Sequence, residues 1–354
     1  MVEDMLAEAG IPSAQVTSVT PLDGGTFNDV SRVTLSDGRR LILKVAPPPD
    51  VPILTYERGI LRTEALFYEL AASHQGLPAV VHAGFGHPDG AGDFLLMTEV
   101  PGQPWPAVAD RIDDGQRQRL RGDLGRIVAG LHAMTGSEFG YPSWPLSASW
   151  RTAFGGMLDT ILTEADQYDI ALPLPTRVIR QLAAKHQSVL DEVTTPVLVH
   201  FDLWDGNILI DTGAETPRIG GVIDAERAFW GDPLADFVSL ALGGDIQRDE
   251  AFLAGYREAG GPARLDASSP VRLALYRTYL YLIMLVESAP RHYDEAKLER
   301  LERSVPPVLA AELGLLMRSG PRKARLGRAR RVRAAGQSPA LATEKQAESA
   351  RRAG

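Results

Sequence analysis

Two short apolar segments, each followed by polar side chains, constrain this sequence more than any other feature. The first, 195–199 (Thr-Pro-Val-Leu-Val), precedes 200–207 (His-Phe-Asp-Leu-Trp-Asp-Gly-Asn), and the second, 220–223 (Gly-Gly-Val-Ile), precedes Asp224. Apolar runs of this length are typical of buried strands. We therefore expect two strands with polar side chains directly behind them: a carboxylate and an amide after the first, and a carboxylate after the second.

These three side chains match the needs of phosphoryl transfer from a nucleotide. That reaction uses a carboxylate that orients and accepts the proton of the acceptor hydroxyl, and oxygen ligands for the Mg²⁺ ion that bridges the phosphates. Asp202 fits the first role, and Asn207 and Asp224 fit the second. Either Asp202 or Asn207 alone could be an ordinary turn residue. Their spacing, together with His200, Gly206 and Asp224, favours a kinase.

Composition indicates a globular protein with room for two lobes. The chain has 354 residues, of which 44% are hydrophobic and 23% charged, as in ordinary soluble proteins. It contains no cysteine, which excludes disulfides and thiolate chemistry. No run reaches the length of a membrane span, and the acidic N-terminus lacks a signal sequence core. We expect a cytoplasmic protein without a membrane partner.

Charge is unevenly distributed. Residues 318–354 carry eleven basic and two acidic side chains, whereas the rest of the chain carries 26 basic and 43 acidic ones. An acidic body disfavours a nucleic-acid partner and suits a cationic small-molecule acceptor. We expect the basic tail to be a solvated, flexible extension, with a contact to nucleic acid or an acidic partner as the alternative.

The pattern along the chain predicts an α+β protein with a small β-rich lobe and a larger helical lobe. Strands are expected in the first hundred residues, with one helix over 54–73 that carries Leu61, Ala65, Tyr68 and Ala72 on one stripe. Apolar residues downstream recur at helical spacing. We predict a nucleotide-binding lobe over 1–100, a hinge at about 97–103 and a catalytic lobe over 104–317. The expected strands are 16–21, 30–35, 40–46 and 94–100, with a turn at 36–38.

The sequence resembles the aminoglycoside phosphotransferase family over about residues 15–310. The resemblance is carried by 200–207, by 222–227 (Val-Ile-Asp-Ala-Glu-Arg) and by 231–236 (Gly-Asp-Pro-Leu-Ala-Asp). Shorter matches are 96–99 (Leu-Met-Thr-Glu), 131–132 (Leu-His) and 139–142 (Phe-Gly-Tyr-Pro). It implies a bilobal protein-kinase-like fold and phosphorylation of small-molecule hydroxyls, and it does not specify the acceptor.

The resemblance also implies roles for individual residues. Asp202 corresponds to the catalytic carboxylate, Asn207 and Asp224 to the Mg²⁺ ligands, and Lys44 to the lysine that reaches the phosphates of ATP or GTP. A lysine within an apolar strand is costly to bury unpaired, so a helix glutamate should pair with it. Glu64 is our choice over Glu57 and Glu69.

Further nucleotide contacts are expected from two segments. One is the loop between the first two strands, whose backbone amides could approach phosphates; a plain hairpin turn explains it about as well. The other is the hinge after the 94–100 strand. The residues concerned are Gly24, Gly25, Thr26 and Asn28 in the loop, and Met97, Glu99 and Val100 at the hinge.

The acceptor site is expected among residues that flank the catalytic ones. Its carboxylates suggest a cationic acceptor and its aromatic residues a glycosidic or heterocyclic one. Other polar residues are expected to hold backbone, and the stripe of Tyr276, Tyr279 and Met284 to be packing. The acceptor candidates are Asp205, Glu226, Arg227 and Trp230, with Tyr141, Trp144 and Trp150 as an aromatic wall; the structural candidates are His200, Asp232, Asp236 and His132.

Two positions depart from the family pattern. Phe201 stands where glycine is usual, and Ala225 where an aromatic residue is usual. Neither change removes a reactive group, but both could alter packing behind the loop. A protein-kinase function is disfavoured, because seven residues between Asp224 and Asp232 leave no room for an activation loop, and no Ala-Pro-Glu follows.

Three functions remain open. We favour an antibiotic kinase that confers resistance, with an aminoglycoside, macrolide, peptide or nucleoside as acceptor. A metabolite kinase of the same fold, acting on an amino sugar, fructosamine, choline or homoserine, is the alternative. A catalytically silent nucleotide-binding module is the third, and it would be marked by a lost Lys, Asp or Asn; none is lost here.

Overall fold

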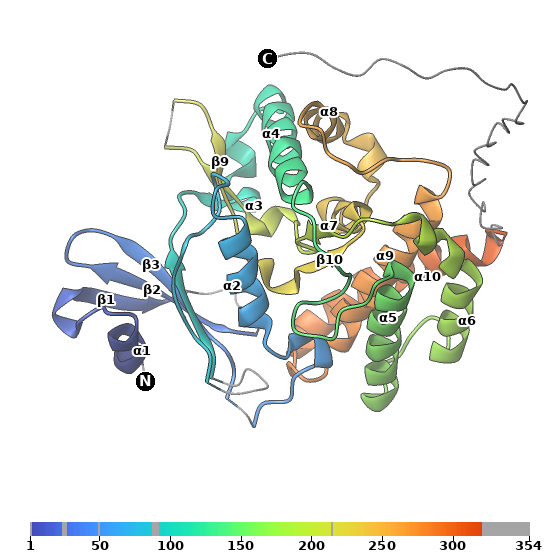
Figure 1. The fold of residues 1–354 in the computed structure, drawn as a ribbon, viewed down its shortest axis with the longest axis horizontal. Coiled ribbons are helices and arrows are strands. Elements are labelled where there is room, and N and C mark those ends of the chain that lie inside the picture. Colours follow the sequence, from blue (N-terminus) through green and yellow to red (C-terminus); the bar gives the residue numbers. More distant parts are fainter. Residues whose placement is uncertain (1, 23–26, 49, 87–91, 214, 321–354) are drawn as a thin grey trace, which may run out of the picture. The chain divides into compact units, whose positions relative to one another are not determined.

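The computed structural model describes residues 2–22, 27–48, 50–86, 92–213 and 215–320 (Figure 1). Three predicted nucleotide contacts, Gly24, Gly25 and Thr26, lie outside the described residues, as does nearly all of the basic tail predicted over 318–354. No helix in the described ranges is long and apolar enough to cross a membrane.

A five-stranded antiparallel sheet forms the N-terminal part (Figure 1). Its strand order is β1-β2-β3-β5-β4. Alternation along each strand sends neighbouring side chains to opposite faces. One face, which includes Leu41 and Leu43, packs with Leu6 of α1 (Val2–Glu8), and the other packs against α2 (Ile60–Leu70). The strands are β1 (Val16–Pro21), β2 (Asp29–Leu35), β3 (Arg40–Val45), β4 (Val80–Gly84) and β5 (Phe94–Thr98).

Helix α2 is shorter than predicted. A 3-10 turn (Thr55–Glu57) comes first, and Gly59 then adopts φ +66°, a left-handed conformation that interrupts any helix begun at residue 54. The helix ends at Leu70, so Ala72 is exposed, although Leu61, Ala65 and Tyr68 are buried as predicted. Because Lys44 alternates with Leu43 along β3, its side chain faces α2.

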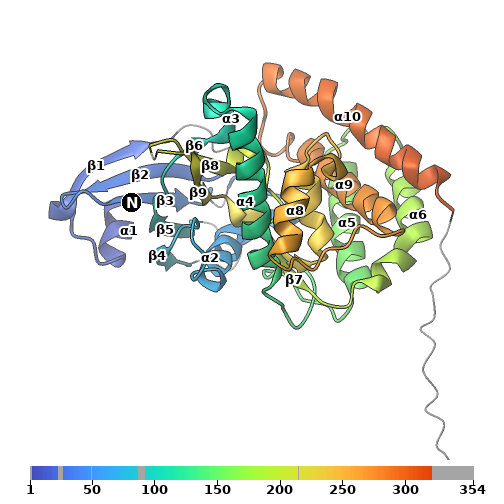
Figure 2. The same cartoon turned by 90° about the horizontal axis from the view of Figure 1, so that it is seen from above.

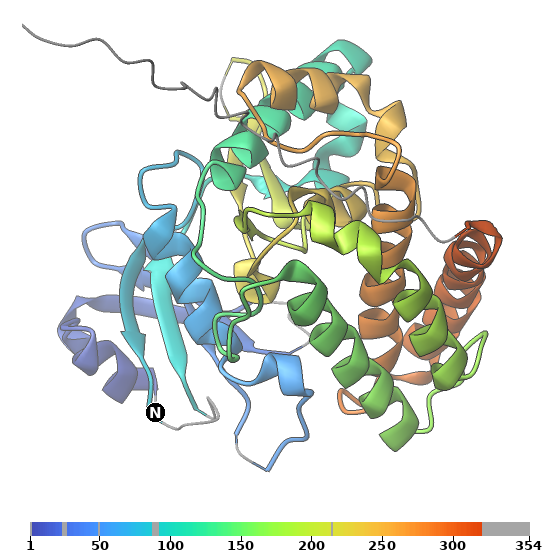
Figure 3. The ribbon, with the colours of Figure 1, turned by 45° about the vertical axis from the view of Figure 1, so that its right-hand side comes forward.

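The remainder is mainly helical, as predicted. Helix α9 is buried along nearly its whole length, and α5 and α10 pack against it (Figure 3). Helices α4 and α8 lie side by side (Figure 2). They approach closely through glycines, since a Cβ at Gly255 would lie 2.0 Å from the Gly122 carbonyl oxygen. The helices are α3 (Trp105–Val108), α4 (Asp114–His132), α5 (Trp150–Gln167), α6 (Thr176–His186), α7 (Asp236–Leu240), α8 (Glu250–Glu258), α9 (Ser269–Val286) and α10 (Glu295–Arg318).

Two small sheets hold the polar loops. Strand β7 (Val197–Val199) pairs with β10 (Phe229–Gly231), and β8 (Ile208–Asp211) pairs with β9 (Arg218–Val222) and with β6 (Gln103–Pro104). The two strands predicted before the polar residues are therefore β7 and β9. Because Ile208 is paired with Val222, the loop that leaves β7 and the residues that follow β9 lie together.

Candidate functional site

Lys44 is the centre of a buried charge cluster. Its Nζ lies 2.8 Å from both carboxylate oxygens of Glu64 and 2.6 Å from Oδ1 of Asp224. The pairing of Lys44 with Glu64, rather than with Glu57 or Glu69, is confirmed. Burial alone would lower the pKa of Lys44, but Asp224 and Glu64 raise it well above its usual value. Lys44 therefore carries a fixed positive charge beside the cavity.

Tyr68 joins the two carboxylates of this cluster. Its hydroxyl donates to Oε1 of Glu64 at 3.2 Å and accepts the backbone N–H of Asp224 at 2.9 Å. Asp224 itself has φ +69°, a conformation that aspartate tolerates better than most residues. Burial raises the pKa of the Asp224 carboxyl, but Lys44 outweighs that effect and holds the pKa below its usual value. The sequence suggested only a packing role for Tyr68.

The loop after β7 brings Asp202 and Asn207 together. The side-chain amide of Asn207 donates to the backbone oxygen of Asp202 at 2.9 Å and to its Oδ2 at 3.2 Å. Since both N–H contacts go to Asp202, the amide oxygen of Asn207 is the atom left for another ligand. The predicted roles of these two residues are thus compatible with their positions.

Asp236 holds the backbone of this loop, as predicted for a structural residue. Its Oδ1 accepts the N–H groups of His200 at 3.1 Å and Phe201 at 2.6 Å, and its Oδ2 lies 2.8 Å from His132. His200 Nε2 donates to the carbonyl of Ile223 at 3.2 Å. Burial lowers the pKa of His200, so the histidine is neutral and links the loop after β7 to the end of β9.

Phe201 adopts φ +63°, the left-handed conformation that glycine adopts without strain. Its ring packs on Phe229 and Tyr279, with centroids 5.0 and 5.7 Å apart. The contacts to Asp236 and to these rings hold the strained backbone in place. The departure from the family's glycine therefore reshapes packing behind the loop, as predicted. Ala225, at the second departure, is fully buried.

Asp202 has a raised pKa of about 6, because burial outweighs the attraction of Arg227. Nη1 of Arg227 lies 3.4 Å from Oδ1 of Asp202, and Nη2 lies 2.6 Å from Glu287. A carboxylate whose pKa lies near neutrality is suited to accept and release a proton. Arg227 is thus the main group that keeps Asp202 ionised.

Glu287 connects Arg227 to a wider buried network. It accepts hydrogen bonds from the Tyr56 hydroxyl and from Nη1 of Arg291, the latter at 3.0 Å. Arg291 also pairs with Glu57, and its guanidinium lies 5.3 Å from the centre of the Phe27 ring. Burial raises the pKa of Glu287, but Arg227 and Arg291 reverse the shift and lower it. Each carboxylate in this network therefore contacts at least one of its two arginines.

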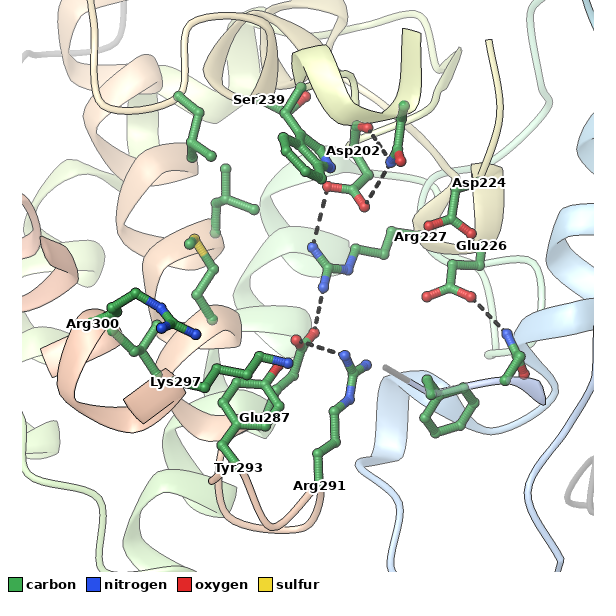
Figure 4. A pocket seen from close by; sticks show the side chains of 18 of the residues that line it. Asp202, Asp224, Glu226, Arg227, Ser239, Glu287, Arg291, Tyr293, Lys297 and Arg300 are labelled. Carbon is green, nitrogen blue, oxygen red and sulfur yellow. Dashed lines mark hydrogen bonds and ion pairs between the residues drawn. The ribbon is translucent and has the colours of Figure 1, made fainter. Parts of the chain in front are cut away.

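Several of these groups line one cavity of about 460 Å³ (Figure 4). One side, called the nucleotide side below, carries residues that were predicted to contact the nucleotide and its metal ion, including Lys44, Asn207 and Asp224. The other side is built from α9, α10 and the segment between them. Its lining there is Leu280, Met284, Glu287, Arg291, Tyr293, Lys297, Arg300, Leu301 and Ser304.

Several predicted acceptor residues lie elsewhere. Tyr141 and Trp150 are only 1% exposed and belong to the core, where Tyr141 bonds to Tyr279 and Trp150 to Tyr276. Trp144 packs on Tyr141 with a centroid distance of 5.2 Å. Tyr141 and Trp150 therefore do not form the predicted aromatic wall, because they fill the interior beside α5 and α9, and the half-buried Trp144 packs against this core.

Trp230 and Asp205 also lie away from the cavity lining. The Trp230 ring packs so closely over Gly136 that a Cβ there would approach within 2.7 Å. Asp205 is exposed and lies 3.5 Å from Arg121 on a neighbouring groove. Glu226 and Arg227 do line the cavity. Trp230 is not part of this lining, and Asp205 lines the adjoining groove, which shares Trp204, Ser239 and Leu242 with the cavity; an acceptor role for either residue stays a prediction.

Glu226 lies on the nucleotide side of the cavity. Its Oε2 accepts from Nδ2 of Asn28 at 2.8 Å, across 198 residues of sequence. Burial, and then Asp224, raise the pKa of Glu226 well above its usual value. Carboxylate oxygens of Glu64, Asp224 and Glu226 lie within 4.8 Å of one another. This crowding of carboxylates is offset by Lys44.

The hinge candidates have clear structural contacts. Glu99 pairs with Arg32 at 2.6 Å and with Arg40 at 2.9 Å. Met97 is buried, and Val100 packs so tightly on Gly221 that a Cβ there would lie 2.3 Å from its Cγ2. Nucleotide binding by the hinge residues stays a prediction.

Asp232, which was predicted to be structural, accepts hydrogen bonds from the Leu234 N–H, from Arg272 and from Tyr276.

Sequence reasoning missed most of the cavity wall. Trp204 is 44% exposed and lines the cavity, with its ring over Gly206, where a Cβ would come within 2.1 Å. An aromatic residue among the polar residues of 200–207 was a usable signal. Met284, assigned to packing, is half-buried and lines the cavity. Lys297 and Arg300 gave no signal, because they look like ordinary charges on an exposed helix.

The chain is similar to known phosphotransferases and kinases. Residues 18–273 match the sequence model of the Phosphotransferase enzyme family. A protein of Lactiplantibacillus plantarum described as a probable ketoamine kinase is 26% identical over 289 residues, which is 78% of this chain and 91% of that protein.

Solved structures share the fold. A protein assigned as a fructosamine-3-kinase of Thermobifida fusca has a TM-score of 0.65 at 20% identity, covering 90% of this chain and 99% of the other. An aminoglycoside phosphotransferase solved with AMP-PNP and hygromycin B has a TM-score of 0.58 at 18% identity, covering 90% and 98%. The bilobal kinase-like fold predicted from the sequence is confirmed.

Proposed function

The chain belongs to the phosphotransferase enzyme family, and we propose that within it the protein moves the γ-phosphoryl group of ATP to a hydroxyl of a sugar-derived metabolite of the ketoamine class. A small-molecule kinase is the activity that the family and the curated relative share. The finer statement concerns the nucleotide, the metal and the acceptor.

The nucleotide side of the cavity carries a fixed cation. Lys44 is held by Glu64 and Asp224 at 2.8 and 2.6 Å and so cannot swing away from the cavity without leaving two buried carboxylates unpaired. We assign it to the α- and β-phosphates of ATP, with GTP as the alternative nucleotide. The hinge at Met97, Glu99 and Val100 would receive the base.

Asn207 and Asp224 fit a magnesium ion. Both line the cavity, and they offer the amide and carboxylate oxygens that Mg²⁺ prefers. The fit is supported by the hydrogen bonds of Asn207, which occupy its N–H group and leave its oxygen for a cation. When bound, Mg²⁺ would neutralise charge on the phosphates. These residues would hold the ion, while Lys44 already compensates Asp224.

Asp202 would receive the proton of the acceptor hydroxyl. The bond between the γ-phosphorus and its bridging oxygen breaks, a bond to the acceptor oxygen forms, and the hydroxyl proton passes to an oxygen of Asp202. Asn207 fixes one of these oxygens and Arg227 approaches the other. Holding the reacting groups in this geometry supplies much of the acceleration.

The proposed class of acceptor follows from the residues that line the α9–α10 side of the cavity. Its one described carboxylate, Glu287, is already paired with Arg227 and Arg291, whereas Lys297 and Arg300 add positive charge. A polycationic aminoglycoside would have to displace these pairs or leave its own ammonium groups unpaired. The cavity thus gives little support to the cationic acceptor that the sequence suggested, and a sugar derivative with at most one ammonium group, balanced by an acidic group, fits better.

An apolar antibiotic of the macrolide type is the second candidate. Leu280, Met284 and Leu301 give the α9–α10 side of the cavity an apolar surface, and Trp204 and Leu242 continue it. Such a surface suits a large apolar ring system better than a small polar metabolite. The cations at Lys297 and Arg300 are the features that this candidate leaves without a partner.

Steady-state kinetics with purified protein would test the proposal. ADP release is measured with ATP and Mg²⁺ against fructosyl-glycine, against a second ketoamine that lacks a carboxylate, and against kanamycin and erythromycin. Products are examined by mass spectrometry. Turnover of the ketoamines, with one phosphate added to the product, is the expected result.

The Asp202→Asn variant serves as the control for contaminating kinases. Turnover of erythromycin or kanamycin with ketoamines inert would replace the proposed acceptor class by an antibiotic. ADP release that persists unchanged in Asp202→Asn would exclude the assigned proton acceptor.

A further inference from the structure

Two cations on the far wall of the cavity have no acidic partner among the described residues. Lys297 lies in the first turn of α10 and Arg300 in the next, and both line the cavity. Figure 4 shows them on the opposite side of the cavity from Asp224 and Glu226, with Arg227 between. They are therefore separate from the groups assigned to the nucleotide.

The contrast with the neighbouring arginines is clear. Arg227 lies 2.6 Å and Arg291 3.0 Å from Glu287, and Arg291 also pairs with Glu57. Within the described ranges Lys297 and Arg300 form no salt bridge; the Lys297 ammonium instead lies 3.5 Å from the centre of the Tyr293 ring. Two cations that line a cavity without a counter-ion favour a ligand that brings a negative charge.

The electrostatic surroundings of Lys297 support this reading. Burial, followed by the neighbouring Arg291, lowers its pKa, and Arg300 adds to the decrease, while Glu287 and Asp294 oppose it. Since like charges repel, placing these cations together costs free energy. An anion bound among them would remove part of that cost.

The position of Lys297 on α10 also favours a bound anion. The first turn of a helix carries partial positive charge from its free N–H groups, so cations there are unfavourable and anions favourable. Lys297 nevertheless occupies that turn of α10, behind the capping residue Asp294. Neither helix stability nor a salt bridge accounts for a lysine at this place.

We propose that Lys297 and Arg300 form a subsite for a carboxylate carried by the acceptor. The inference rests on the proposed function, and it narrows the acceptor to a sugar joined to an amino acid, whose α-carboxylate meets the two cations while a sugar hydroxyl faces Asp202. Leu280, Met284 and Leu301 line the same wall and would contact the carbon chain.

Kinetics with a matched pair of acceptors test the subsite. Fructosyl-glycine carries the carboxylate, and fructosyl-glycinamide has nearly the same shape without the carboxylate charge, while both keep the secondary amine. The double substitution Lys297→Gln with Arg300→Gln should raise KM for fructosyl-glycine about 10- to 100-fold, the size of one or two charge-assisted hydrogen bonds. KM for the amide, KM for ATP and kcat should change less than about twofold, since neither cation contacts the reacting groups.

Arg303→Gln is the matched control on the same helix. Arg303 pairs with Glu299, its side chain is 73% exposed, and it is not part of the cavity lining. It should leave KM for both ketoamines unchanged. An equal loss in Arg303→Gln and in the double variant would mean that general surface charge, and not a subsite, attracts the acceptor, and the proposal would be wrong.

Calorimetric binding of the two probes to the unsubstituted protein separates this proposal from the proposed function. Tighter binding of fructosyl-glycine than of the amide, without turnover of either, would keep the subsite and reject the ketoamine kinase. Turnover of both with equal KM would reject the subsite and keep the kinase. If the double variant instead weakens fructose 6-phosphate and leaves fructosyl-glycine unchanged, the cations serve a phosphate and the carboxylate assignment fails.

Discussion

The two walls of the cavity differ in how their charges are satisfied. On the nucleotide side, Lys44, Glu64 and Asp224 form a buried cluster in which every charge has a partner within 2.8 Å. On the α9–α10 side, Lys297 and Arg300 line the cavity without a salt bridge to any described residue. The nucleotide side is therefore preorganised for the nucleotide, which kinases of this family share. The α9–α10 side has charge and apolar surface available for the acceptor, which differs from one kinase to another.

Asp202 lies where the two walls meet, and its replacement should have the largest effect. Asp202→Asn should lower kcat about 10²- to 10⁴-fold, because the proton acceptor is lost. Nucleotide affinity should stay within about threefold, since Lys44 and Asp224 are untouched. Calorimetric binding of an ATP analogue and steady-state turnover check both statements; a loss of nucleotide affinity as large as the loss of turnover would place Asp202 on the nucleotide wall instead.

The same variant should not be less stable. A folded-state pKa of about 6, against an ordinary value of 3.8, means that the Asp202 carboxyl favours folding below about pH 4 and that this contribution is lost as the pH rises through 6. At neutral pH its burial therefore costs about 3 kcal/mol. Asp202→Asn removes that cost, so Tm at pH 8 should be equal or higher; a lower Tm would show that Asp202 stabilises the fold.

Substitution of Trp230 tests whether this residue contributes to acceptor binding or only to packing. Trp230→Ala should lower the free energy of unfolding by about 2–3 kcal/mol, because it empties the packed space over Gly136. KM for the acceptor should not change, since Trp230 does not line the cavity. Urea unfolding and kinetics at a temperature where the variant is folded are the measurements; a raised acceptor KM with normal stability would restore the original assignment.

Arg227 controls the ionisation of Asp202 from the acceptor side. The kcat/KM of the unsubstituted enzyme should fall as the pH drops below about 6, where Asp202 becomes protonated. Arg227 favours the ionised form, so Arg227→Gln should raise the pKa of Asp202 and move this decline to higher pH. Arg227→Lys keeps the charge and should move it less. A pH profile that is the same in all three proteins would show that Arg227 does not act on Asp202.

Tyr68 should give the smallest effect, confined to the nucleotide wall. Tyr68→Phe removes the hydroxyl that joins Glu64 to the backbone of Asp224. Loss of a buried hydrogen bond costs about 1 kcal/mol, so KM for ATP should rise a few-fold while KM for the acceptor stays constant. An effect on the acceptor alone would contradict the separation of the two walls.

Much of the nucleotide wall could be predicted from the sequence. Asp202 and Asn207 are five residues apart in one loop, so their contact depends on local backbone geometry, and Lys44 and Glu64 are joined by the short path from β3 to α2. The choice of Glu64 over its neighbours followed from the expected helix and proved correct. The prediction of an aromatic wall was wrong for Tyr141 and Trp150. Aromatic residues are common both in binding surfaces and in protein cores, and these two side chains are buried in the core.

The sequence by itself therefore determined the fold class, the chemistry and the residues that lie close together along the chain. Only the tertiary structure decided what stands opposite Asp202. The Tyr56–Glu287 contact spans 231 residues, and the cavity wall depends on how α10 packs against α9. Such contacts are set by the packing of whole helices, which no local spacing encodes, so an exposed-looking lysine and arginine on α10 became cavity residues only once the chain was folded.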